Sequence, residues 1–165
     1  MHSSNIQSGL YASLARVGSF FAEKMKQKIK DVKAPSKIAE HVSVSSPVVG
    51  DRESYVDIVI DTNKEHGAPM AGAFEWGSGI HGKGGDKYII KGNPLLAIPA
   101  SRWPNKKYND DPAILPFVNH PGVAARPYIE PTIKENKDEI RKILAQGFKA
   151  SILSEVQKVT IIEVK

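Results

Sequence analysis

The sequence predicts an α+β fold in which a mostly antiparallel sheet is packed by two long amphipathic helices. Two stretches, one toward each end of the chain, carry large apolar residues at spacings of three and four, which is the helical period. Between them, short apolar runs alternate with polar residues and are separated by Gly and Pro, which is typical of paired strands. Helices and strands that are segregated along a chain in this way indicate an α+β domain.

The composition is that of a chain that can build its own core. The protein has 165 residues, of which 41% are hydrophobic, so we expect residues 1–165 to form a single domain. The absence of cysteine excludes a disulfide scaffold, a thiolate metal site and a cysteine nucleophile. No stretch approaches the roughly 20 apolar residues of a membrane span, and the N-terminus lacks the pattern of a leader. We therefore expect a protein made in a cytoplasm, with no membrane partner.

The charge permits contact with nucleic acid without requiring it. The net charge is +5, with 23 basic and 18 acidic residues. A dedicated nucleic-acid binder usually concentrates its positive charge on one surface, whereas here the two signs are interspersed along the chain.

The first regular segment is predicted to run as a helix from about Gln7 to Lys33, with Pro35 limiting its end. Its large apolar residues form one stripe. They are Leu10, Leu14, Val17, Phe21, Met25, Ile29 and Val32. Lys26, Lys30 and Lys33 follow one flank of this stripe, where they could meet DNA phosphates or acidic neighbours. We favour the simpler interpretation, a solvated face whose lysine stems cover apolar surface.

A hairpin, a short helix and a second hairpin are expected next. Residues 41–61 alternate apolar and polar around Pro47 and Gly50, which predicts a hairpin with a long turn. Met70 to Trp76 predicts a helix of two turns that ends at the glycines following it. In residues 88–98, two apolar runs flank the turn residues Lys91 to Pro94, which predicts the second hairpin. A short strand is expected at residues 115–118.

Residues 101–112 are predicted to form a flexible loop. In it, Trp103 and Tyr108 flank two lysines, an arrangement that single-strand binders use. Four residues are too few to predict such a site. We favour packing of the loop on a neighbouring subunit, where Trp and Tyr are frequent anchors. Mobility of the loop is the alternative.

The longest regular segment is predicted to start between Pro127 and Pro131, because proline is tolerated in a helix only in its first turn. Its apolar face reaches about Leu153. The face consists of Ile129, Ile133, Ile140, Ile143, Leu144, Phe148 and Ile152. Val156 to Lys165 is rich in β-branched residues and is predicted to be a C-terminal strand. A terminal strand must pair with a sheet, so Val159 and Ile161 become candidates for an assembly contact.

No pattern of catalytic or metal-ligating residues is found in the sequence. The five histidines are scattered, and no HExxH, GxSxG or P-loop pattern occurs. Candidate acid and base groups are the pair Asp110-Asp111 with His120 or Glu130, and Glu75 beside Trp76. Loop polarity, turn chemistry and an interface charge explain them more simply. We therefore expect no enzymatic activity, no metal and no cofactor.

Two short segments resemble a family of phage proteins. The segment Phe74-Glu75-Trp76-Gly77-Ser78-Gly79 is similar to an aromatic–acidic–aromatic–Gly segment of tail-completion proteins, which join heads to tails at the phage neck. The segment Arg126-Pro127-Tyr128-Ile129-Glu130-Pro131 is similar to the start of that family's long helix, and a Pro-Gly loop at residues 120–122 precedes it. The chain departs from the family in its turn at residues 34–37 and in its additional loop at 101–112.

The resemblance implies a structural virion protein that forms a homo-oligomeric ring around the DNA channel at the head–tail interface. The implied partners are phage connector, tail terminator and tail tube proteins, with non-specific contact to genomic DNA. The implied location is the virion neck or tail, after assembly in the host cytoplasm. The candidate assembly residues are Glu75, Trp76, Trp103, Tyr108, Val159 and Ile161. The alternative function is a basic nucleic-acid-binding domain that uses Lys24 to Lys37 and the Trp103 to Tyr108 loop.

The two apolar stripes are predicted to meet each other or one shared sheet. Neither helix can leave five or more large apolar side chains in water, at about 25 cal/mol per Å² of apolar surface. Phe21→Asp and Ile140→Asp are therefore expected to unfold the domain, as measured by thermal denaturation. If both variants keep the wild-type melting midpoint, the stripes do not form the core.

Overall fold

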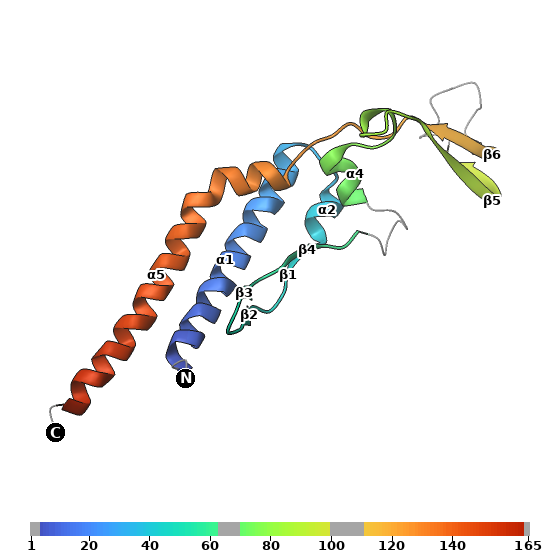
Figure 1. Cartoon of the computed structure of the whole chain (residues 1–165). Helices are drawn as coiled ribbons and strands as arrows, with labels where there is room; N and C mark the ends of the chain where they lie inside the picture. Colours follow the sequence, from blue (N-terminus) through green and yellow to red (C-terminus); the bar gives the residue numbers. More distant parts are fainter. Residues whose placement is uncertain (1–3, 63–69, 100–110, 164–165) are drawn as a thin grey trace. The chain divides into compact units, whose positions relative to one another are not determined.

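The computed structural model describes residues 4–62, 70–99 and 111–163. At residues 4, 5 and 154–163 it describes the backbone alone. About 51% of the residues are helical and 22% lie in small antiparallel sheets, which confirms the predicted α+β class. The elements, shown in Figure 1, are α1 (Ser4–Asp31), α2 (Ser36–Glu40), β1 (Val42–Val44), β2 (Val48–Val49), β3 (Ser54–Tyr55), β4 (Ile58–Ile60), α4 (Met70–Trp76), the 3-10 turn η1 (Gly79–His81), β5 (Tyr88–Ile98), β6 (Ala113–His120) and α5 (Ile129–Glu163).

The chain divides into two compact units. The helix unit comprises Met1–Ala71 with Arg126–Lys165, and the ribbon unit comprises Gly72–Ala125. The boundary falls inside α4. The single domain expected from the sequence stays a prediction, in the sense that the two units would unfold together.

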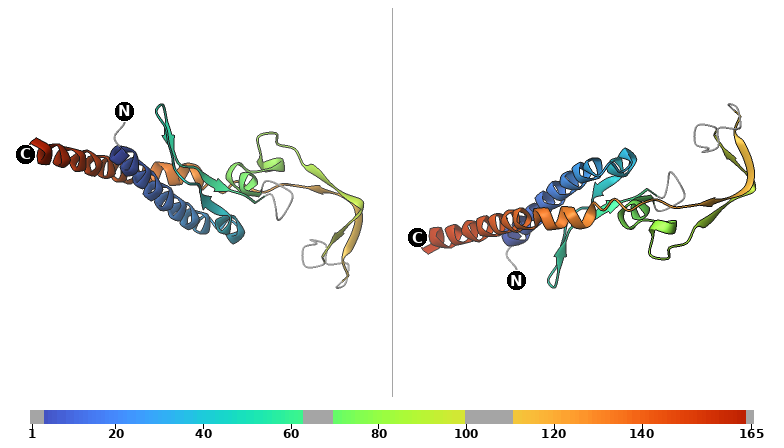
Figure 2. Two further views of the ribbon diagram at one scale, coloured as in Figure 1. Left: turned by 90° about the horizontal axis from the view of Figure 1, so that it is seen from below. Right: turned by 90° about the horizontal axis from the view of Figure 1, so that it is seen from above.

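The core of the helix unit is built on α1. The predicted stripe is confirmed, since Leu14, Val17, Phe21, Met25 and Ile29 are all buried. The long helix α5 lies beside α1 and runs antiparallel to it (Figures 1 and 2). The two predicted amphipathic helices therefore pack on each other.

The two long helices approach closely where each presents a glycine to a serine of the other. A Cβ atom on Gly9 of α1 would overlap the hydroxyl of Ser151, and one on Gly147 of α5 would overlap the hydroxyl of Ser13. Both serines are buried. Each hydroxyl donates to the glycine carbonyl four residues earlier in its own helix, at 2.7 Å in α1 and 2.8 Å in α5. The buried hydroxyls are thereby satisfied without a bulky partner.

The opposite face of α1 carries the first hairpin. Gly18 lies nine residues after Gly9, which at 100° per residue places it on the other side of the helix. A Cβ there would come within 2.6 Å of Val44 and 2.9 Å of Val56. The hairpin pairs β1 with β4 and β2 with β3, both antiparallel, as the alternating pattern predicts. A residue without a side chain thus lets the sheet close onto the helix.

The start of α5 is fixed by buried hydrogen bonds. The ring of Tyr128 is fully buried, and its hydroxyl donates to the carbonyl of Ala71 at 2.9 Å. Thr132, also fully buried, donates its hydroxyl to the carbonyl of Tyr128 at 2.5 Å. The Arg126 guanidinium donates to the carbonyl of Lys33, which follows the end of α1. The helix begins at Ile129, within the predicted interval between the two prolines.

The predicted C-terminal strand is wrong, because α5 continues through that segment to Glu163. The β-branched residues there lower helix propensity by only a few tenths of a kcal/mol each. No Gly or Pro follows Gly147 before the helix ends. A helix that is already nucleated gains one hydrogen bond for each further residue, so weak propensity does not stop it.

The predicted second hairpin is also wrong in its turn. Residues 88–98 form one long strand, β5, which pairs antiparallel with β6 rather than folding back on itself at Lys91 to Pro94. The register shifts between Lys91 and Leu96. Pro94 has no N–H to donate to the ladder, which accounts for an irregularity there instead of a turn. The strand expected at residues 115–118 is confirmed and extends over the whole of β6.

The close approach of α1 and α5 leads to a test of the helix packing. Gly147→Leu should lower the free energy of unfolding by about 2 kcal/mol or more, because the new side chain meets Ser13 and forces the helices apart. The matched control is Ala150→Leu, which adds the same side chain at an exposed position of α5 and should change stability by about 0.5 kcal/mol or less. Urea denaturation followed by circular dichroism measures both. Equal stabilities of the two variants would contradict the packing.

Candidate assembly interface

The ribbon unit presents a two-stranded ribbon made of β5 and β6. In its ladder Ile89 is opposite Asn119, and Lys91 is opposite Phe117. Residues that are opposite in a ladder share a face, and faces alternate along each strand. One face therefore carries Ile89 and Phe117, and the other carries Tyr88.

Large apolar side chains are exposed on both faces of this ribbon. Ile89 is 56% exposed and Phe117 is 51% exposed on the first face. On the second face, Ile114 is 54% exposed and Tyr88 is 41% exposed, with the Tyr88 ring 5.0 Å from that of His120. A two-stranded ribbon is at best marginally stable in water, and burying one such side chain is worth about 1.5–3 kcal/mol. The ribbon therefore has the properties of a surface that another protein covers.

A glycine junction holds the base of the ribbon. The backbone N–H of Ser78 donates to the carbonyl of Val123 at 2.9 Å, and the N–H of Val123 donates to the Ser78 hydroxyl at 3.0 Å. The N–H of Ile80 donates to the carbonyl of Pro121 at 2.8 Å. Gly79 and Gly122 pack against each other with φ angles of +60° and +99°. A Cβ on either would overlap backbone of the other segment.

This junction joins two segments that are far apart in the sequence. The segment Ser78-Gly79 belongs to the aromatic–acidic motif, and Pro121-Gly122 belongs to the Pro-Gly loop of the same resemblance. From the sequence, Gly79 was assigned to the end of the preceding helix and Gly122 to a turn. Their pairing was missed because the two segments are more than 40 residues apart, and periodicity carries no signal for such a contact.

The helix before the junction ends as predicted. Gly77 follows Trp76 with φ of +76°, the left-handed conformation that glycine adopts at helix ends. The two candidate assembly residues of α4 differ in environment. Trp76 is 72% exposed, whereas Glu75 is only 5% exposed. Trp76 is thus accessible to a neighbouring subunit, and the carboxylate of Glu75 lies inside the fold.

The candidate DNA-facing lysines lie at the end of α1. Lys26 is half-buried, and Lys30 is exposed on the same flank. Lys33 follows the helix with φ of +56°, in the left-handed conformation of a helix cap. Within the described ranges these three lysines form no ion pair. On the other flank, the Lys28 ammonium lies 2.5 Å from the Glu135 carboxylate of α5. Lys28 therefore forms an ion pair between α1 and α5.

Electrostatic contacts elsewhere on α5 are at the surface. The hydrogen bond and charge of Lys134 hold the pKa of Glu130 below its usual value. Both side chains of the pair are exposed, and the pair spans one turn of α5. Such pairs support a helix locally, and they do not form a site.

The remaining assembly candidates fall where the structure gives no side chains. Trp103 and Tyr108 lie outside the described residues, as does most of the predicted loop at 101–112. Val159 and Ile161 belong to the C-terminal part of α5, whose side chains are outside the described part. Their assignment to an interface stays a prediction.

Neither a metal centre nor a membrane-spanning helix is found in the described part of the chain. No group of three or more His, Asp or Glu side chains is arranged to hold a metal ion there. None of the described helices combines the length and the apolar character needed to cross a bilayer.

Comparisons of the chain with models of protein families, with curated protein sequences and with solved structures give no match. The fold and the ribbon define an α+β protein with an uncovered apolar surface.

The glycine junction leads to a test of how the ribbon is held. Gly122→Ala should destabilise the ribbon unit by about 1–3 kcal/mol, because the positive φ and the overlap with Ser78 both disfavour a Cβ. Gly84→Ala is the control, since a Cβ at Gly84 has nothing within 4 Å. Limited proteolysis should cleave the first variant faster than the wild type and leave the second unchanged. Equal cleavage rates for the two variants would show that the junction does not hold the ribbon.

Proposed function

We propose that this chain is a structural virion protein of a tailed phage, a tail-completion or neck component that forms a ring around the DNA channel at the head–tail interface. The observation that carries the proposal is the β5–β6 ribbon, whose two faces both expose large apolar side chains. Monomeric proteins rarely expose extended apolar surface, and such surface usually marks a site of protein association.

A ring accounts for the two faces better than a simple dimer does. Rings close by heterologous contacts, in which one patch meets a different patch of the next copy. Each subunit then has two neighbours, and a ribbon that lies between copies has both faces covered. A twofold dimer of this ribbon would cover one face and leave the other in water.

The structural roles of the motif residues support the proposal. The aromatic–acidic segment ends α4 and forms the glycine junction under the ribbon. The Arg-Pro-Tyr segment fixes the start of α5 through the buried Tyr128 and Thr132. The residues that carry the resemblance thus hold the ribbon and the long helix in place.

As a neck component, the protein would bind copies of itself and the connector, tail terminator and tail tube proteins. It would act in the virion neck or tail, after assembly in the host cytoplasm. Its contribution would be to bind and position these proteins, with no chemical step and no cofactor.

A basic nucleic-acid-binding domain is the second candidate function. The flank of Lys26, Lys30 and Lys33 favours it, since these lysines form no ion pair within the part of the chain that is described. Cations on a helix can neutralise phosphates and release counterions. The flank lies on the helix unit, so it would also suit a subunit whose neighbours surround DNA.

Self-association without DNA distinguishes the two functions. The purified chain, free of nucleic acid, should form closed rings of one size in mass photometry and negative-stain microscopy, because the apolar ribbon is covered by neighbouring copies. Ile89→Ser with Ile114→Ser should shift the protein to monomer, and Val59→Ser, at an exposed position of β4, should not.

The contrary result has a distinct signature. A wild-type monomer at all concentrations, with a DNA affinity that falls steeply with salt, would contradict the ring and favour the nucleic-acid-binding function. Charge reversal of Lys26 and Lys30 would then abolish that affinity.

A further inference from the structure

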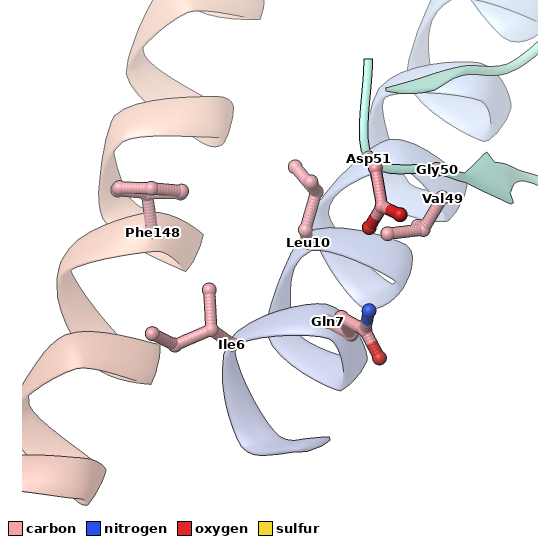
Figure 3. A pocket seen from close by; sticks show the side chains of 7 residues that line it. All are labelled: Ile6, Gln7, Leu10, Val49, Gly50, Asp51 and Phe148. Atoms are coloured by element: carbon pink, nitrogen blue, oxygen red, sulfur yellow. The ribbon is translucent and has the colours of Figure 1, made fainter. Parts of the chain in front are cut away.

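An apolar groove opens on the helix unit between α1, α5 and the turn of the first hairpin (Figure 3). Its walls are Ile6 and Leu10 of α1, Phe148 of α5 and Val49 of β2. Phe148 is 46% exposed, so its ring is available to an occupant. The groove has a volume of about 190 Å³. A cavity of about 150 Å³ with a comparable lining binds benzene, so this groove has room for one aromatic ring.

A carboxylate stands at the edge of this apolar groove. Asp51, in the turn between β2 and β3, lines the groove next to Val49 (Figure 3). Gln7 is the other polar residue of the lining. The groove therefore combines an apolar interior with a negative charge at the rim.

The ribbon carries a pair of side chains that is complementary to this groove. Phe117 and Lys91 are directly opposite in the ladder, so their side chains stand on one face, about 5 Å apart at Cβ. Both are exposed. A phenyl ring beside an ammonium group matches an aromatic-sized groove beside a carboxylate, in shape and in charge.

We propose that Phe117 of one copy inserts into this groove of a neighbouring copy, with Lys91 beside the rim carboxylate of Asp51. The inference rests on the proposed ring, because ribbon and groove are different patches of one chain. A contact between two different patches is the heterologous kind that propagates from copy to copy. A second copy is the occupant that this chain itself supplies with matching chemistry.

Cross-linking between copies tests the contact. Because the chain has no cysteine, Asn119→Cys in a tagged copy and Gln7→Cys in an untagged copy introduce one thiol each and leave both phenyl rings in place. Asn119 is exposed on the same face of the ribbon as Phe117, and Gln7 lines the groove. After mixing and brief oxidation, the expected product is a disulfide-linked heterodimer of one tagged and one untagged chain, which requires the two Cα atoms to come within about 7 Å. The control replaces Gln7→Cys with Val59→Cys, an exposed position outside the groove, and should give no such product.

Charge exchange tests the polar half of the contact. Lys91→Glu and Asp51→Lys should each weaken self-association by about tenfold or more, since like charges then meet at the rim. The double variant should recover most of the wild-type affinity, as measured by analytical ultracentrifugation. Lys83→Glu, at an exposed position of the loop before β5, is the control for a general change of charge and should leave self-association unchanged.

The outcomes separate this inference from the proposed function. Rings that form without the specific cross-link, and that are unaffected by Phe117→Ser or by the charge variants, would overturn the groove contact and leave the ring standing. A wild-type chain that never self-associates would overturn the ring, and the groove contact with it. A specific cross-link together with recovery in the double charge variant would support both.

Discussion

The close approach of α1 and α5 depends on two glycines that each face a serine of the opposite helix, Gly9 with Ser151 and Gly147 with Ser13. These contacts bring the helix backbones together without large side chains between them. The serine hydroxyls donate within their own helices, so burying them leaves no polar group unsatisfied. The rest of the helix unit follows from this pairing, because α1 then has one face for α5 and the opposite face, at Gly18, for the first hairpin.

The same pairing explains why the apolar groove exists. Gly9 and Gly147 bring the two backbones close, and the residues that directly follow them, Leu10 and Phe148, line a groove that the hairpin turn borders. On the ribbon unit, many apolar residues of β5 and β6 are exposed, and nothing within the described ranges covers them. An exposed groove and an exposed apolar ribbon on one chain each leave hydrophobic free energy unrealised, and association of copies would recover part of it.

Much of the fold could be predicted from the sequence, because the underlying signals are local. The stripe from Leu14 to Ile29, the stop at Gly77 and the start of α5 at Ile129 follow from helical period, glycine conformation and proline sterics. The candidate site was harder to predict from the sequence. Trp76 was a candidate assembly residue and is exposed. Phe117 was only part of an expected strand, and Phe148 was part of the apolar face of the long helix, since periodicity tells which residues share a face and not whether that face is covered.

The sequence by itself determined the class of fold, the two long amphipathic helices and the absence of cysteine chemistry, since each depends on residue type and spacing alone. The tertiary structure decided what the local pattern left open. The β-branched C-terminal segment continues α5, because an existing helix propagates more easily than a new strand finds a partner. The strand β5 pairs with β6, and Gly79 meets Gly122, through contacts between residues far apart in sequence. Such contacts are fixed by which distant surfaces fit together, and local sequence patterns carry little information about that fit.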